Sequence, residues 1–272
     1  LNGGDPFKSS KWRVLAGMNF KEVKMIDGGG NKRPYADRTP TTVRGNVTDI
    51  ICVGFTPNDG SCPAENTLVS FVANTSRNNL NNSVNPTSGD KFKLGTEQFV
   101  SVGESSPTFN RMRASYSYFI PTKLINLTKG CKSSESASED CPQTIALQLK
   151  AGTIIGELPP YEAFCLGGTS SVRGWGPCEL GVSKSYVEGT IEHRFPIWRM
   201  LSGALFVDAG SDLGTQKDVP GKPGTLLQKS GSGYSLGGGI GIKTPIGPLR
   251  LDIASQDLSG DWRYTLGVGW KF

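Results

Sequence analysis

The residues of this sequence that could do chemistry are few and scattered. The single histidine, His193, sits among apolar residues at alternate positions, and neither a Gly-x-Ser-x-Gly string nor a pair of suitably spaced carboxylates stands out. Serine hydrolases and glycosidases need such constellations, because an acid or base must be held beside the reacting group. The sequence therefore indicates that the protein is not an enzyme, and it predicts no cofactor.

Six cysteines form three local pairs, each within a region expected to be a loop. A zinc site is not expected, because the sequence contains no Cys-x-x-Cys. Disulfide staples formed in an oxidising compartment fit the spacing better than a redox switch does, although six cysteines allow about 15 pairings. The candidate pairs are Cys52 with Cys62, Cys131 with Cys141, and Cys165 with Cys178.

One further loop combines an arginine with glycines, small polar residues and a tryptophan. It runs from Gly167 to Gly176 and contains Val172, Arg173, Gly174 and Trp175 in succession. Taken alone, such a string is typical of an exposed hairpin tip with a solvated arginine. The elements around the loop decide whether the arginine has another role.

These elements are expected to be strands, because apolar residues recur at every second position. In the clearest segment, one face carries Tyr264, Leu266, Val268, Trp270 and Phe272, and the other carries small or charged residues. Expected strands cover residues 11–26, 67–77, 90–102, 109–121, 144–156, 185–196, 201–210, 233–244, 248–256 and 262–272.

Composition supports an all-β protein. Glycine makes up 36 of 272 residues and charged residues only 19%, which argues against coiled coils and long helices. The net charge of +5 is too small and too dispersed to indicate a nucleic-acid partner. No apolar run reaches the roughly 18 residues of a membrane-spanning helix, and the first residues do not resemble a secretion signal.

Two architectures agree with this alternation. A soluble sandwich would bury its apolar faces against each other, whereas a membrane barrel would turn them toward lipid. Long connections alternate with mostly short turns, and aromatic residues lie near strand ends, as at a membrane interface. These features favour an antiparallel transmembrane β-barrel, with charged residues such as Glu192, Asp208 and Asp252 facing its lumen.

Several strings resemble motifs of the outer-membrane assembly and translocation superfamily that includes BamA, the two-partner secretion transporters and the chloroplast import channel. Residues Val172 to Trp175 are similar to its Val-Arg-Gly-Phe/Tyr loop motif, and Phe206 to Gly210 to its Phe-x-Asp-x-Gly strand motif. Gly189 to Glu192 resembles its Gly-x-x-Glu motif, while residues 158–164 and 244–252 are similar to its cyanobacterial and plastid branch. The resemblance covers most of residues 67–272.

The resemblance implies a structural role for these residues. The loop would fold into the barrel lumen, where Arg173 would pair with Asp208 and lie near Glu192. The strand alternation independently turns both carboxylates inward. Trp270 and Phe272 are expected to end the last strand as its aromatic signal.

Family members carry soluble POTRA domains before a barrel of sixteen strands. Residues 1–272 are therefore expected to form one barrel domain that contains the last ten of those strands. The chain would be a fragment, or a shortened homologue that closes a smaller barrel or assembles with another chain. In a fragment, the strand over residues 11–26 would be an exposed edge.

The function implied is the insertion of β-barrel proteins into an outer membrane, with a weak seam between the first and last strands. The alternatives are a protein-translocating channel of the chloroplast outer envelope or a secretion transporter, and a passive porin. Expected partners are outer-membrane lipids, unfolded outer-membrane or precursor polypeptides, and POTRA domains with accessory subunits. The expected location is the cyanobacterial outer membrane, with the chloroplast outer envelope as the alternative. Glycines at 237–241, 267 and 269 either weaken the seam or let the loop approach the wall.

Overall fold

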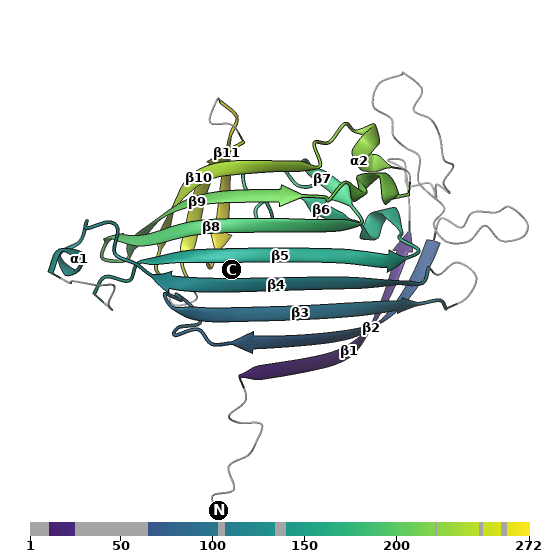
Figure 1. Ribbon diagram of the computed structural model, residues 1–272, viewed down its shortest axis with the longest axis horizontal. Coiled ribbons are helices and arrows are strands. Elements are labelled where there is room, and N and C mark those ends of the chain that lie inside the picture. The colour runs from purple at the N-terminus through teal and green to yellow at the C-terminus, as the bar shows by residue number, and fades with distance from the viewer. Residues whose placement is uncertain are drawn as a thin grey trace, which may run out of the picture.

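A single curved sheet of ten antiparallel strands dominates the computed structural model (Figure 1). Each strand pairs with its neighbours in chain order. The structure describes residues 11–24, 65–102, 107–133, 140–220, 222–244, 247–256 and 260–272. The strands are β1 (Trp12–Lys24), β2 (Glu65–Asn78), β3 (Gly89–Val100), β4 (Phe109–Pro121), β5 (Thr144–Gly156), β8 (Ser185–Trp198), β9 (Leu201–Ser211), β10 (Ser232–Ile242), β11 (Leu249–Ser255) and β12 (Trp262–Val268).

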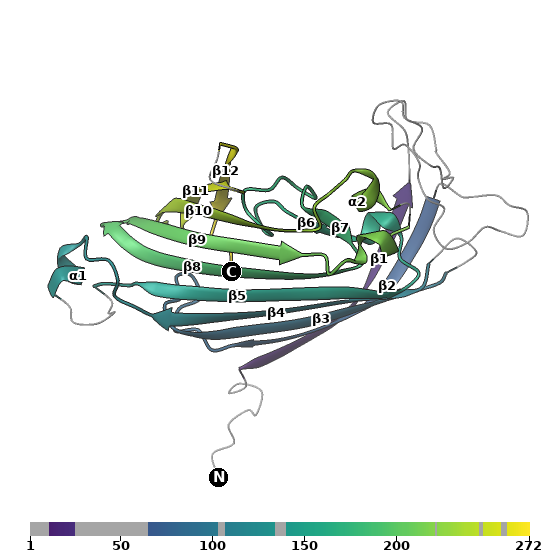
Figure 2. The same cartoon turned by 45° about the horizontal axis from the view of Figure 1, so that its top comes forward.

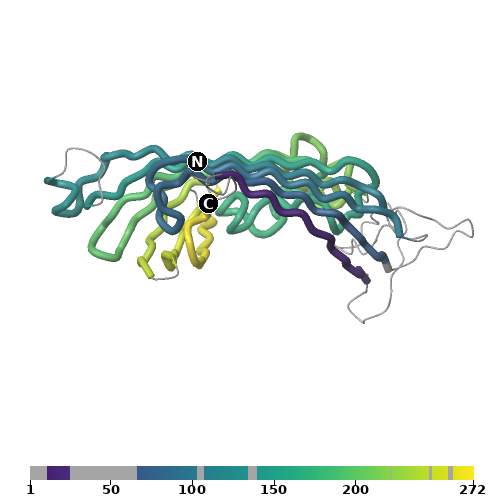
Figure 3. The backbone as a smooth tube through the Cα atoms, turned by 90° about the horizontal axis from the view of Figure 1, so that it is seen from below, coloured from purple at the N-terminus to yellow at the C-terminus, as the bar shows by residue number. Residues whose placement is uncertain are grey.

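All ten expected strands are present, and the all-β class is confirmed. The sheet bends into an arc whose concave side encloses the connection between β5 and β8 (Figures 2 and 3). Within the described residues, no ladder joins β1 to β12, so the arc is open. No helix in the described part of the chain is both long and apolar enough to cross a membrane.

The two faces of the sheet differ in chemistry, as the alternation predicts. Thr190 on β8 lies opposite Asp208 on β9, and both side chains are buried on the concave face. Their neighbours Ile191 and Val207 are 56% and 41% exposed on the convex face. The concave face therefore carries buried polar groups, and the convex face carries exposed apolar side chains.

The connections differ in length at the two ends of the sheet. The turn between β8 and β9 has two residues, whereas the β5–β8 and β9–β10 connections are long and contain short elements of their own. The 122–143 connection, which breaks the alternation of lengths, contains α1 (Lys129–Ser133). The other short elements are η1 (Pro160–Glu162), β6 (Phe164–Leu166), β7 (Gly181–Ser183), η2 (Thr215–Asp218) and α2 (Pro223–Leu226).

The β5–β8 connection packs against the sheet through a hydrophobic cluster. Strands β6 and β7 form a separate two-stranded sheet, which the sequence did not predict. Burial of apolar area is the main favourable term holding such a segment in place. The cluster contains Leu68, Phe99, Phe109, Ile154, Leu158, Phe164, Leu166, Val172, Leu180 and Val219.

The last strand is shorter than expected. The alternation predicts a strand over residues 262–272, but β12 ends at Val268. Gly269 has a φ of +84°, which glycine adopts without the steric cost that a side chain would bring. The chain leaves the sheet there, so Trp270 and Phe272 do not belong to the strand, and the chain end lies within the arc (Figure 3).

Candidate functional site: an arginine loop on the concave face

The arginine loop is the tip of the β5–β8 connection. The β6 and β7 ladder forms its base, and a disulfide between Cys165 and Cys178 closes it. At the tip, the Gly168 N–H donates to the Trp175 carbonyl at 2.9 Å. Gly174 has a φ of +89° and lies against Ser235 of β10. The loop therefore turns back sharply and presents Arg173 to the wall.

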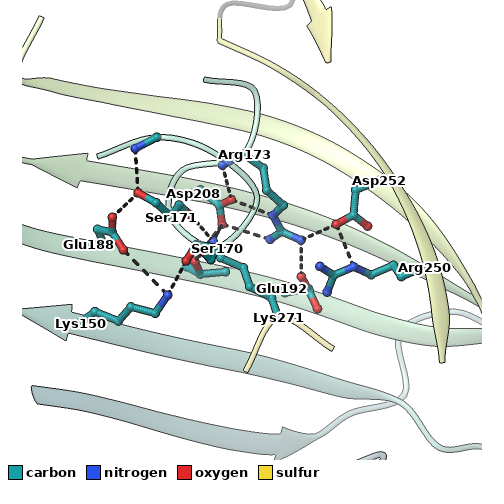
Figure 4. A network of polar contacts seen from close by, with 12 residues as sticks. Lys150, Ser170, Ser171, Arg173, Glu188, Glu192, Asp208, Arg250, Asp252 and Lys271 are labelled. Atoms are coloured by element: carbon teal, nitrogen blue, oxygen red, sulfur yellow. Dashed lines mark hydrogen bonds and ion pairs between the residues drawn. The ribbon is translucent and has the colours of Figure 1, made fainter. Parts of the chain in front are cut away.

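Arg173 is fully buried and bound by three carboxylates (Figure 4). Its Nε and Nη2 donate to the two oxygens of Asp208 at 2.8 and 3.1 Å, which is the bidentate arrangement. Its Nη1 donates to Glu192 at 2.8 Å and to Asp252 at 3.2 Å. The backbone N–H of Arg173 also donates to Asp208, at 3.1 Å. The guanidinium fork suits this set of acceptors better than an ammonium would.

The strand motif around Asp208 provides more than a carboxylate. Phe206 lies under the guanidinium, with the Arg173 Cζ atom 3.3 Å from the ring centroid, which is a cation–π contact. A Cβ atom on Gly210 would come within 2.8 Å of the Val172 side chain. The alternate residues Phe206, Asp208 and Gly210 therefore stack on the arginine, bind it and leave room for the loop.

Further charges surround this cluster. Arg194 donates to Glu192 at 2.7 Å, and Arg250 Nε forms an ion pair with Asp252 at 2.9 Å. Lys271 lies 3.0 Å from Asp208 and donates to Thr190 at 3.0 Å, as well as to the Ser171 carbonyl. Burial alone would lower the pKa of Arg173, but the nearby carboxylates outweigh it and hold that pKa above its ordinary value. Arg173 therefore stays charged within a buried network.

The remaining loop residues are also fixed. The Trp175 indole N–H donates to the Tyr234 carbonyl at 3.0 Å, and Val172 is fully buried. Ser171 donates to Glu188 of β8. Lys150 of β5 donates to the Ser170 carbonyl at 2.6 Å. An exposed hairpin tip with a solvated arginine would make none of these contacts.

Trp270 and Phe272 lie on the concave side instead of in a strand. The Arg194 Cζ atom is 4.4 Å from the Trp270 ring centroid and 4.9 Å from that of Phe272. The Trp270 indole N–H donates to Asn85 at 2.9 Å. Neither terminal nitrogen of Arg194 has a hydrogen-bond partner within the described residues. Aromatic faces therefore support this arginine.

The sequence did not predict three features of the site. Lys271 and Arg194 were not expected beside Asp208 and Glu192, and Asp252 was not expected to contact Arg173. Asp252 could have been found, because strand alternation places it on the same face as Asp208. Lys271 could not, because its position depends on the turn at Gly269.

The cysteine pairs and the glycines of β10 were also expected to have structural roles. Disulfides join Cys131 to Cys141 and Cys165 to Cys178, and Cys52 and Cys62 lie outside the described residues. Cβ atoms on Gly237 and Gly239 would collide with Phe206 and Asp252, respectively. The atoms that limit these two positions belong to the neighbouring strands β9 and β11 and not to the loop, so the two glycines leave room for side chains that contact Arg173.

Comparison with known proteins identifies relatives in plants. Outer envelope protein 39, chloroplastic, of Arabidopsis thaliana is 29% identical over 247 residues, covering 90% of this chain and 58% of that protein. Protein TOC75-4, chloroplastic, of the same plant is 34% identical over 205 residues, covering 75% and 48%. Outer envelope protein 80, chloroplastic, is 41% identical over 128 residues, covering 47% and 17%. The chain thus spans at most 58% of these relatives.

The fold has a solved counterpart, the crystal structure of BamA from Haemophilus ducreyi lacking POTRA domains 1–3. The TM-score is 0.61 at 16% identity, and the similarity covers 94% of this chain and 49% of that one. This likeness shows a shared fold. Residues 2–272 match the Omp85 superfamily domain, and the chain belongs to that superfamily.

Proposed function

We propose that this chain forms part of a transmembrane barrel that inserts β-barrel proteins into the outer membrane, with the β5–β8 connection folded into its lumen. The buried Arg173 network carries the proposal. A passive porin has no need of an internal arginine anchored by three carboxylates. The apolar convex face supports a lipid-facing wall, and membership of the Omp85 superfamily supports the class of activity.

Of the two expected locations, we favour the chloroplast outer envelope. The three plant relatives named above are chloroplastic, and two of the names include "outer envelope protein". We propose that the chain is the C-terminal ten strands of a sixteen-stranded barrel, and that POTRA domains and accessory subunits act with it. The proposed activity is strand pairing and local disturbance of the bilayer, and it involves no covalent step, metal or cofactor.

A polypeptide-translocating channel is the second candidate. A groove of about 620 Å³ on the concave face favours it. Its lining includes the polar and charged side chains of Asn74, Lys93, Glu97, Arg113 and Lys150 beside apolar ones such as Leu15 and Val72. Such a surface suits an extended chain that keeps its polar groups solvated.

The test compares Arg173→Ala with Arg263→Ala in the full chain reconstituted into lipid vesicles. Arg263 also binds the same connection, through Glu179 at 2.8 Å, but the two side chains are 44% and 40% exposed. Removing Arg173 leaves buried carboxylates without their positive partner, which costs about 3–5 kcal/mol. An exposed pair contributes only about 0–1 kcal/mol. We expect Arg173→Ala to lower the folding rate of an added unfolded β-barrel about tenfold or more, equivalent to about 1.4 kcal/mol, and Arg263→Ala to leave it unchanged.

The same vesicles separate the candidate functions. Under the insertion proposal, the client becomes folded in the bilayer, as measured by its heat-modifiable mobility on a gel. Under the translocation alternative, an added precursor becomes protease-protected inside the vesicle. If the client folds equally well in vesicles that contain the wild type, the Arg173→Ala variant or no protein, a passive pore is the better description.

A further inference from the structure

We infer that the β5–β8 connection has a second anchor, Glu162, which positions the first four strands independently of Arg173. Glu162 ends the short helix η1, and its side chain is only 4% exposed. It lies eleven residues before Arg173 in the same connection. The inference concerns the position of the connection, so it does not rest on the proposed function.

Both carboxylate oxygens of Glu162 are bound by cations from the sheet. Oε2 accepts from Arg111 Nη1 of β4 at 2.5 Å, and Oε1 accepts from Lys21 Nζ of β1. Arg111 Nη2 in turn donates to Glu97 of β3 at 2.6 Å. Arg111 is 14% exposed, so the Arg111–Glu162 pair is shielded from water, whereas Lys21 is 55% exposed. The Arg111 pair is therefore the stronger contact.

Neutral contacts extend the same anchor to β2. Glu97 accepts from Ser70 of β2 at 2.8 Å. The Tyr161 hydroxyl, next to Glu162, donates to Asn66 of β2 at 2.9 Å. Tyr161 also packs against the hydrophobic cluster that contains Leu68 and Phe99. One short helical turn thus contacts side chains from β1, β2 and β4 directly. It reaches Glu97 of β3 through Arg111.

The two anchors hold different parts of the arc. The carboxylates that bind Arg173 come from β8, β9 and β11, whereas Glu162 contacts β1 and β4. Strand β1 pairs only with β2 within the described residues. Glu162 is therefore a contact that ties this strand to the interior of the arc. Release of one anchor would leave the connection held by the other.

Hydrogen exchange of the full chain in lipid vesicles tests the two anchors separately. We expect Glu162→Gln to speed amide exchange about tenfold or more in residues 12–24 and 157–163, because these segments lose a shared restraint. Residues 168–175 would keep their protection. Arg173→Ala should give the opposite pattern, and the double variant should speed exchange throughout the connection.

Glu157→Gln is the matched control. Glu157 lies in the same connection and accepts from the Thr108 N–H at 3.0 Å, but it is exposed. It should leave residues 12–24 at the wild-type rate. If Glu162→Gln prevents folding, Tyr161→Phe replaces it, because it removes only the hydroxyl that binds Asn66. It should give a smaller rise in the same segments.

Two results would overturn the inference. One is unchanged exchange in residues 12–24 on substitution of Glu162 or Tyr161. The other is an equal rise in residues 12–24 and 168–175 with Glu162→Gln, because the connection would then move as one unit with a single anchor. Hydrogen exchange needs no client protein, so failure of this inference is separable from failure of the proposed insertion activity.

Discussion

At the scale of single residues, the choice of arginine at position 173 follows from the number and direction of its acceptors. Two oxygens of Asp208 and one each from Glu192 and Asp252 surround the guanidinium, and Phe206 lies under it. A lysine could carry the charge, but its three rotatable donors do not match a planar set of acceptors, and it stacks less well on a ring. Charge alone is thus insufficient at this position.

Arg173→Lys tests this argument because it retains the positive charge. We expect the free energy of unfolding to fall by about 1.5–3 kcal/mol, the contribution of a hydrogen bond to a charged group. The measurement is the urea midpoint of the full chain folded in lipid vesicles. Arg263→Lys, at an exposed ion pair, should change that midpoint little. Equal midpoints for the two variants would show that the fork geometry is unimportant.

The residues of the site differ in how far the sequence predicts them. Alternation places Glu192, Asp208 and Asp252 on one face, because strand side chains have a period of two. The pairing of Arg173 with Asp208 came from the family resemblance, since spacing along the chain does not show where a loop folds. Lys271 and the Arg194 contacts with Trp270 and Phe272 depend on a turn that alternation does not reveal.

At the scale of elements, β9 is the strand that receives the loop. Phe206, Asp208 and Gly210 point to the concave face, and each meets a different part of the Val172–Arg173 pair. Glycine at position 210 follows from this arrangement, because the nearest side chain atom of Val172 occupies the space of a Cβ. The Phe-x-Asp-x-Gly motif thus consists of the three residues of β9 that contact the loop.

Gly210→Ala should loosen the loop without changing the charges. Val172 is buried and cannot move away freely, so the added methyl overpacks the contact at a cost of about 1–3 kcal/mol. We expect faster hydrogen exchange in residues 168–175. Gly189→Ala is the control, because the atom nearest to its Cβ position is 4.0 Å away. Unaltered exchange in Gly210→Ala would mean that the loop does not need this close approach.

The long elements were predictable and the short ones were not. Alternation is clearest in β4, β5, β8, β10, β11 and β12, because one face of these strands meets polar groups and the other is apolar. Strands β6 and β7 have three residues each, too few for a periodic signal, and tertiary contacts determine them. Strand β12 ends early because the chain turns at Gly269. The alternation of residues in the sequence gives no sign of this turn, because it continues to Phe272.

At the scale of the whole molecule, the curved sheet separates two environments. The concave side holds the charged network and the β5–β8 connection, and the convex side exposes apolar residues along its strands. A sheet with water on its convex side would expose a large apolar surface, which soluble monomers rarely do. The proposed barrel in a bilayer resolves this difficulty, because lipid covers the convex face.

Adjacent positions on β5 test the orientation of the wall. Leu149 is 55% exposed on the convex face, whereas Gln148 faces the concave side and donates to Ser117 of β4 at 3.2 Å. A lysine at a lipid-facing position near the bilayer centre costs about 2–4 kcal/mol. Leu149→Lys should therefore lower the free energy of unfolding from lipid vesicles by about that amount. Gln148→Lys should lower it by less than about 1 kcal/mol, because its ammonium remains in the polar interior. A larger loss for Gln148→Lys than for Leu149→Lys would reverse the assignment of the faces and contradict the barrel, since both lysines occupy the same strand at the same depth.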